Sequence, residues 1–234
     1  MPTLSDSLAL AAQLIAHFDA KLIDIVGLSL AVSLGATMLA ALIGLPLGAA
    51  VAVVRFPGRG VVIAVLNALM GLPPVVVGLF VYLILSRAGP LGHFGLLFTP
   101  KAMVIAQTIL IVPILAALSR QVVEDAWSEY REQLTSLGAN VARSAMTLLW
   151  DTRYSLATVL LAGFGRAIAE VGAVMIVGGN IDGVTRVMTT TIALETSKGD
   201  LPLALGLGFV LIALVILLNF AAHATRTWSR AHFG

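Results

Sequence analysis

The chain has 234 residues, of which 59% are hydrophobic and 11% are charged, with a mean hydropathy of +1.01. Soluble domains carry about 25% charged residues, so this composition excludes an ordinary soluble protein and predicts one membrane-embedded helical domain, residues 1–234. The net charge of +2 is an arginine excess typical of the cytoplasmic side of membrane proteins, which argues against a nucleic-acid partner. The chain has no cysteine and its four histidines are scattered, so we expect neither disulfides nor a metal site.

Apolar residues at helical spacing run through most of the chain. Residues 4–20 mix apolar and polar positions, and we expect a short amphipathic helix at the lipid surface. This segment lacks the basic start and the cleavage site of a signal peptide. The pattern predicts an all-α polytopic membrane protein. We expect its five transmembrane helices at about residues 25–54, 61–86, 102–119, 155–181 and 201–224.

The first span contains glycines that allow close helix packing, and the second contains prolines that interrupt a helix. Small surfaces for close helix packing are present in the first span, at Gly27, Gly35, Gly44 and Gly48. The second span is interrupted by residues 71–74, which include Pro73 and Pro74. Prolines inside an apolar run free backbone carbonyls that lipid does not satisfy. They indicate either a kinked helix that lines a translocation pathway or a kink that serves packing.

A polar island at about residues 120–153 separates the third and fourth spans. Its apolar residues recur at steps of three and four, which places them on one helical stripe; they are Trp127, Tyr130, Leu134, Leu137, Val141 and Leu148. Gly138 and Asn140 are poor helix formers, so we expect two short amphipathic helices that meet there. A side chain at Gly138 would hold these helices apart. The island is suited either to docking of a soluble partner or to lying on lipid headgroups.

The fourth span contains two charged residues, Arg166 and Glu170, one helical turn apart. Each would cost about 2.5–3.5 kcal/mol near the middle of a membrane, so neither should face lipid. They can pair on one face of a helix. The pair indicates an element of the translocation gate, an interhelical clamp, or a self-contained pair near the membrane surface.

Neutral polar residues follow the fourth span. Asn180 is a common helix terminator, and hydroxyl groups beyond it approach the external mouth. Hydroxyls can hold a dehydrated oxyanion weakly enough to release it. Alternatively, they bond back to helix carbonyls. The hydroxyls belong to Thr185, Thr189, Thr190 and Thr191.

The basic residues predict the orientation of the chain. Most of them lie on the cytoplasmic side if the polar island is cytoplasmic, which predicts an external N-terminus and a cytoplasmic C-terminus in the inner (cytoplasmic) membrane. The sequence has no GxxxxGK[ST] phosphate loop and no HExxH or GxSxG motif. We therefore expect neither ATP binding nor catalysis by this chain.

The polar island resembles the EAA loop of ABC-importer permease subunits. Glu132 and Gly138 stand at the spacing of that motif's Glu and Gly. Residues 133–134 replace its two alanines, and residues 150–151 stand where Leu-Pro is usual, so the likeness is incomplete in this stretch.

Three further stretches are similar to permeases of the molybdate, tungstate and sulfate type. Leu72–Gly92 and Phe164–Arg186 look like the matching segments of that family. Ala169 departs from the pattern, because a glycine is usual there. Thr189–Gly208 is most similar to the tungstate branch.

This resemblance implies the permease subunit of an ATP-driven importer for a tetrahedral oxyanion, with tungstate as the expected substrate and molybdate or sulfate as alternatives. Two permease copies would form the pathway. Each would dock its loop on a separate ATP-binding subunit that carries ATP and Mg, and an extracytoplasmic oxyanion-binding protein would deliver the substrate. The coupling residues implied are Glu132, Gly138 and Ala139, with Trp127, Tyr130 and Leu134 as the packing face.

The residues expected at the pathway or gate are those named above in the second and fourth spans and after them: Pro73, Pro74, Arg166, Glu170, Asn180, Thr185, Thr189, Thr190 and Thr191. Two other classes stay open. A stand-alone secondary transporter or channel would move its substrate without an ATPase. A membrane anchor for a soluble complex would be insensitive to substitutions around Pro73 and Pro74.

Overall fold

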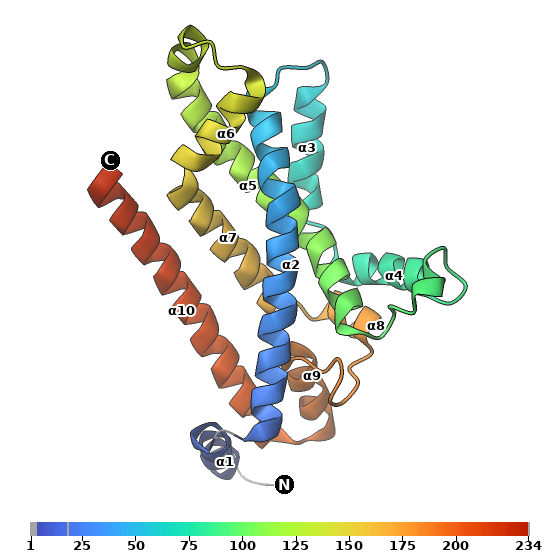
Figure 1. The fold of residues 1–234 in the computed structure, drawn as a ribbon. Helices are drawn as coiled ribbons and strands as arrows, with labels where there is room; N and C mark the ends of the chain where they lie inside the picture. The colour runs from blue at the N-terminus through green and yellow to red at the C-terminus, as the bar shows by residue number, and fades with distance from the viewer. Residues whose placement is uncertain (1–3, 18, 234) are drawn as a thin grey trace. The chain divides into compact units, whose positions relative to one another are not determined.

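The computed structural model describes residues 4–17 and 19–233, and within them it contains helices and turns but no strand (Figure 1). This confirms the all-α class for the described part of the chain. The helices are α1 (Leu4–Ala16), α2 (Ala20–Val53), α3 (Arg59–Leu69), α4 (Pro74–Leu85), η1 (Gly92–Phe94, a 3₁₀ turn), α5 (Pro100–Ser136), α6 (Val141–Asp151), α7 (Arg153–Ile168), α8 (Gly172–Gly178), α9 (Met188–Lys198) and α10 (Leu201–Phe233).

Three described helices are long and apolar enough to cross a membrane by themselves: α2, α5 and the Leu201–Ala222 part of α10. Two further pairs, α3 with α4 and α7 with α8, reach the required length only when each pair is taken together across its break. The chain is thus a multi-pass membrane protein with three to five spans. The count of five stays a prediction, as does the position of α1 at the lipid surface.

The expected second span is divided into α3 and α4 rather than kinked. Pro73 adopts an extended conformation and is the N-cap of α4, and Pro74 is its first residue. A proline at the first helical position costs nothing, because that N–H has no partner within the helix. The residue before a proline is also disfavoured in the helical conformation, which separates Leu72 from α3.

The expected fourth span, residues 155–181, is divided as well, because α7 ends at Ile168 and α8 begins at Gly172. No proline stands in this gap. Bonds from other elements hold it open: Gln107 of α5 donates to the carbonyl of Ala167 at 3.0 Å, and Thr189 of α9 donates to the carbonyl of Glu170 at 2.7 Å. Tertiary hydrogen bonds replace helical ones at this break.

The expected third span, residues 102–119, lies within a longer helix. α5 continues without a break from Pro100 to Ser136 and has 37 residues. Its only internal proline is Pro113, and no breaker follows until Gly138. The first of the two short helices expected in the polar island is therefore the second half of α5.

The chain divides into two compact units. The first comprises the described residues of Met1–Gly35, Pro73–Gln107 and Arg166–Leu217, and the second those of Ala36–Leu72, Thr108–Gly165 and Leu218–Gly234.

Close backbone packing joins α4 to α8 in the first unit (Figure 1). A Cβ atom added to Gly78 of α4 would lie 2.8 Å from the Cα of Ala173 in α8. Ser29 of α2 accepts a hydrogen bond at 2.7 Å from the backbone N–H of Met188, the first residue of α9. The contact at Gly78 leaves no room for a larger side chain between α4 and α8. The bond of Ser29 joins α2 to α9.

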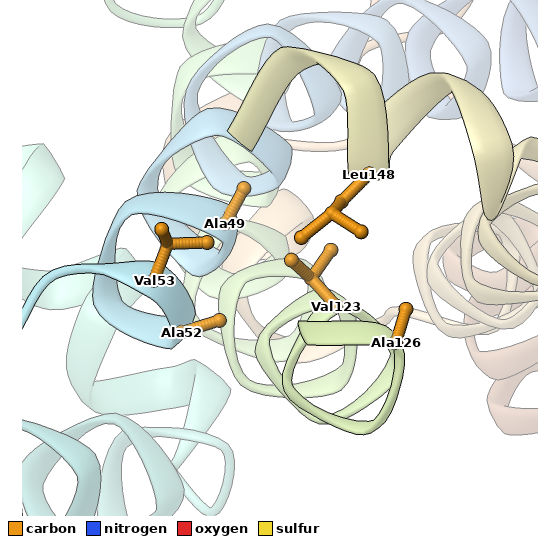
Figure 2. Close-up of a cluster of buried hydrophobic side chains, with 6 residues drawn as sticks. All are labelled: Ala49, Ala52, Val53, Val123, Ala126 and Leu148. Carbon is orange, nitrogen blue, oxygen red and sulfur yellow. The ribbon is translucent and has the colours of Figure 1, made fainter. Parts of the chain in front are cut away.

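A cluster of small and branched side chains forms a core of the second unit (Figure 2). Val123 of α5 and Leu148 of α6 point toward one another within it and are almost fully buried. The other members come from α2 and α5: Ala49, Ala52, Val53 and Ala126. The cluster packs α6 back against α5 and α2.

Candidate functional site

The turn between α5 and α6, residues 137–140, is called the elbow below. Gly138 has a φ of +72° and donates to the carbonyl of Thr135 at 3.0 Å, while Ala139 donates to the carbonyl of Leu134 at 3.0 Å. This pair of bonds is the Schellman pattern that ends a helix at a left-handed glycine. Asn140 then caps α6, because its side-chain oxygen accepts from the backbone N–H of Arg143 at 2.9 Å. The break predicted at Gly138 and Asn140 is confirmed.

The reason given above for Gly138 is wrong. A Cβ atom added there would meet nothing within 4 Å, so a side chain would not push the two helices apart. Glycine is favoured because other L-residues are strained at a positive φ.

The apolar stripe of the polar island is only partly buried. Trp127, Tyr130 and Leu134 pack against the buried cluster that contains Leu148, as one stripe requires. Leu137 and Val141 do not join it, because they flank the elbow and are 83% and 52% exposed. Their placement on one helical stripe with the other residues was wrong, because α5 ends at Ser136 and the left-handed Gly138 separates it from α6.

Exposed apolar and charged groups lie in the elbow and on the two helices that it joins, α5 and α6. Met146 and Trp150 of α6 are 71% and 72% exposed, in addition to Leu137 and Val141. Glu132 of α5 is exposed and borders a hollow of about 850 Å³. The described α5 residues that line this hollow are Ser128, Glu129, Arg131, Glu132, Thr135 and Ser136.

The charged pair of the fourth span forms as predicted, although Glu170 lies in the break after α7. Arg166 donates to the Glu170 carboxylate at 2.5 Å, and the other carboxylate oxygen accepts from the backbone N–H of Ala173 at 3.2 Å. The Glu170 side chain is 4% exposed and that of Arg166 is 39% exposed. A buried carboxylate is thus compensated by one cation and one backbone donor.

The four threonines are buried, and each hydroxyl donates to a backbone carbonyl. Thr185 donates to Gly178 at 2.6 Å and Thr189 to Glu170 at 2.7 Å. Thr190 and Thr191 both donate to Val187. The bond of Thr185 agrees with the alternative that these hydroxyls bond back to helix carbonyls, whereas Thr189 bonds to the break between α7 and α8. Direct contact with an anion stays a prediction.

Asn180 lies just after α8 and has a φ of +50°. Its side-chain nitrogen is 3.4 Å from the carbonyl of Thr190. Pro73 and Pro74 lie at the N-terminus of α4, so the first unit contains all the residues expected at the gate. Among the described residues, no group of three or more His, Cys, Asp or Glu side chains could hold a metal ion.

Sequence analysis missed a cluster of charges in the second unit, Arg59, Arg120 and Glu124. Glu124 of α5 accepts from Arg59 at 2.6 Å and also from Arg120, one turn earlier in α5. The spacing of Arg120 and Glu124 was a detectable signal. The partnership with Arg59 was not, because the two residues are 65 positions apart.

No protein-family model matches this chain. A probable anion ABC transporter permease protein of Haloferax volcanii is 44% identical over 85% of this chain and 88% of the relative. The tungstate uptake system permease protein TupB of Peptoclostridium acidaminophilum is 40% identical over 94% of this chain and 96% of the relative.

More distant matches extend the range of anions. A sulfate transport system permease protein, CysT of Salmonella typhimurium, is 28% identical over 74% of this chain and 65% of its own length. Among solved structures, the MetNI methionine ABC transporter in inward-facing conformations matches with a TM-score of 0.66. The match covers 88% of this chain and 95% of that chain at 18% identity, so it supports the fold alone.

Proposed function

The chain belongs to the ABC-transporter permeases of the tungstate, molybdate and sulfate type, and we propose that it imports tungstate as the permease subunit of an ATP-driven complex. The observation that carries the substrate is the 40% identity to a tungstate uptake permease over almost the full length of both chains. Molybdate and sulfate are the alternative substrates, because all three are tetrahedral oxyanions and a permease need not discriminate where a separate binding protein does.

ATP hydrolysis belongs to a partner subunit in this proposal. The chain supplies the route through the membrane and the mechanical connection, while two ATP-binding subunits hold ATP and Mg. A second copy of the permease completes the pathway, and an extracytoplasmic binding protein delivers the anion. The complex is placed in the cytoplasmic membrane with the elbow on the cytoplasmic side.

The elbow is the proposed contact with the ATP-binding subunit. Leu137 of the elbow and three residues of α6, Val141, Met146 and Trp150, are large apolar side chains that are all more than half exposed, and exposed apolar surface of this kind marks interaction sites. Glu132, near the end of α5, is exposed as well. A cleft on a soluble subunit would bury these groups. Movement of that cleft would then move α5, which runs from the elbow as one continuous helix.

The broken segments of the first unit are the proposed gate. α4 and α8 pack at backbone distance, and each follows a break in its span, so they form one compact element. The compensated Arg166–Glu170 pair keeps this element neutral overall, and the threonine bonds hold α9 beside it. An anion in transit would meet no unpaired cation at this pair, because Arg166 is already bound to Glu170, and this favours release.

The test is reconstitution of the chain in liposomes with and without its ATP-binding subunits, with the binding protein outside and ATP inside. We expect uptake of tungstate that requires ATP and the binding protein. Competition by molybdate and sulfate ranks the three substrates. Flux without the ATP-binding subunits would instead identify a stand-alone transporter, and absence of flux under all conditions would favour a membrane anchor.

A further inference from the structure

The second half of α2 and the middle of α5 are in backbone contact within the second unit. A Cβ atom added to Gly48 would lie 2.5 Å from the carbonyl oxygen of Ala116 and 2.8 Å from the backbone nitrogen of Arg120. At Gly44, one turn earlier, it would lie 2.9 Å from the Cβ of Leu115. Small residues four apart permit this approach. α2 cannot slide along α5 here without separating from it.

Arg59 binds the end of α2 from the start of α3. Its Nε donates to the carbonyl of Val51 at 2.7 Å, and Nη2 lies 3.3 Å from the carbonyl of Ala52. These carbonyls belong to the last turn of α2 and have no partner within the helix. The guanidinium therefore caps α2, as a cation near a helix C-terminus is expected to do.

Glu124 connects this cap to α5. One carboxylate oxygen accepts from Nη2 of Arg59 at 2.6 Å, and the other accepts from Nη1 of Arg120. Glu124 is 36% exposed, while Arg59 and Arg120 are 26% and 12% exposed, so water screens these bonds only in part. Arg59, Glu124 and Arg120 are called the clamp below.

Two residues of the clamp, Arg120 and Glu124, lie on α5, the continuous helix that ends at the elbow. Glu124 precedes the end of α5 at Ser136 by about three turns, or about 18 Å along the axis. A displacement of the elbow is transmitted along α5 to Glu124. The clamp can pass it to α2 and α3 together, because Arg59 holds the end of one helix and belongs to the other.

We propose that Glu124 is a positioning residue that locks the α2–α3 connection to α5, so that movement of the elbow is converted into movement of these helices. The inference rests on the proposed function, because it concerns transport driven from the elbow. It assigns a role in energy coupling to three residues outside the elbow. Arg59 belongs to α3, and Arg120 and Glu124 lie at least three turns before the end of α5. Loss of Glu124 leaves the cap of α2 intact but removes its ion pair with α5, so that only side-chain and backbone packing still joins these two helices.

The decisive experiment compares Glu124→Gln with the matched control Asp125→Asn, the neighbouring exposed carboxylate of α5. Both remove one negative charge from the same helix. In the reconstituted complex we measure anions transported per ATP hydrolysed, together with the yield of assembled complex. We expect the ratio to fall about fivefold in Glu124→Gln, the lower end of typical coupling between sites, and to stay unchanged in Asp125→Asn.

A double-substitution cycle tests whether Glu124 acts through Arg59. Adding Glu124→Gln to Arg59→Gln should reduce the ratio no further than Arg59→Gln alone. If the complex that carries Glu124→Gln does not assemble, the transport ratio of Arg59→Lys tests the proposal instead. Its single ammonium retains a cation for Glu124 but cannot also reach both α2 carbonyls, so we expect a partial fall in the ratio.

The outcomes separate the two proposals. A wild-type ratio in Glu124→Gln, with or without a loss of assembled complex, would overturn the inference and leave the proposed function standing, because a merely structural clamp changes yield and not the ratio. An unchanged ratio in Arg59→Lys would do the same where Glu124→Gln fails to assemble. Absence of ATP-dependent uptake by the wild-type complex would overturn both.

Discussion

At position 138, a single backbone angle determines which amino acid is favoured. Its φ is +72° and the space around it is open, so the requirement is conformational and not steric. We predict that Gly138→Ala destabilises the elbow by about 1 kcal/mol and that Gly138→Asn costs less, because asparagine tolerates the left-handed region. Limited proteolysis of the elbow in the purified protein measures both. Equal resistance of Gly138→Ala and the wild type would mean that the elbow does not need this angle.

Glu170 is far more buried than Arg166, so substitutions of the two residues should cost different amounts of stability. Arg166→Ala leaves a carboxylate that is 4% exposed without its cation, whereas Glu170→Ala leaves an arginine that is 39% exposed. We predict a loss of about 3 kcal/mol for Arg166→Ala and clearly less for Glu170→Ala, because only the first strands a buried charge. The double variant should be more stable than Arg166→Ala alone. Thermal unfolding in detergent gives the order, and equal losses in the two single variants would contradict it.

At the scale of elements, the four glycines of α2 have unequal roles. A Cβ atom at Gly48 would overlap the backbone of α5, while one at Gly27 would meet nothing within 4 Å. We predict that Gly48→Ala destabilises the second unit by about 1–3 kcal/mol, as overpacking does, and that Gly27→Ala is neutral or stabilising. Thermal unfolding of the two variants, which carry the same substitution in the same helix, provides the comparison. A neutral Gly48→Ala would show that α2 and α5 can separate freely.

The sequence predicts those breaks that have local causes. Pro73 and Pro74 mark the start of α4, and Gly138 and Asn140 mark the elbow, because each residue itself disfavours a continuing helix. The break between α7 and α8 has no proline, and its local signals are Gly172, which begins α8, and Glu170, whose side chain accepts from the backbone N–H of Ala173. Gln107 also bonds to the carbonyl of Ala167 from another helix. No periodicity within the span could have indicated this bond from Gln107, which is 60 positions away.

In the candidate site too, only the features with local causes could be predicted from the sequence. The burial of Trp127, Tyr130 and Leu148 follows from helical spacing, because all three lie inside helices. Leu137 breaks the pattern because it lies next to a left-handed glycine. The partnership of Arg59 and Glu124 was invisible, since it depends on how α3 returns toward α5. Local chemistry could be derived from the sequence, whereas long-range pairing could not.

At the scale of the whole molecule, the number of spans decides where the elbow lies. α2, α5 and α10 can each cross the membrane alone, and the α3–α4 and α7–α8 pairs either cross or return to the side they entered from. If both pairs cross, the elbow and the α9 region lie on opposite sides of the membrane. If both return, the elbow and α9 lie on the same side. The proposed function requires the first arrangement with the elbow in the cytoplasm.

The absence of cysteine from the chain makes this question directly accessible. Single cysteines at Leu137, which is 83% exposed, and at Thr196, an exposed residue of α9, report the two sides separately. We predict that a membrane-impermeant maleimide labels Thr196→Cys in right-side-out vesicles and labels Leu137→Cys only in inverted ones, because the basic residues favour a cytoplasmic elbow. Labelling after detergent permeabilisation controls for accessibility at both positions. Labelling of both cysteines from the outside would place the elbow beyond the reach of a cytoplasmic ATP-binding subunit and would contradict both the five-span topology and the coupling role that depends on it.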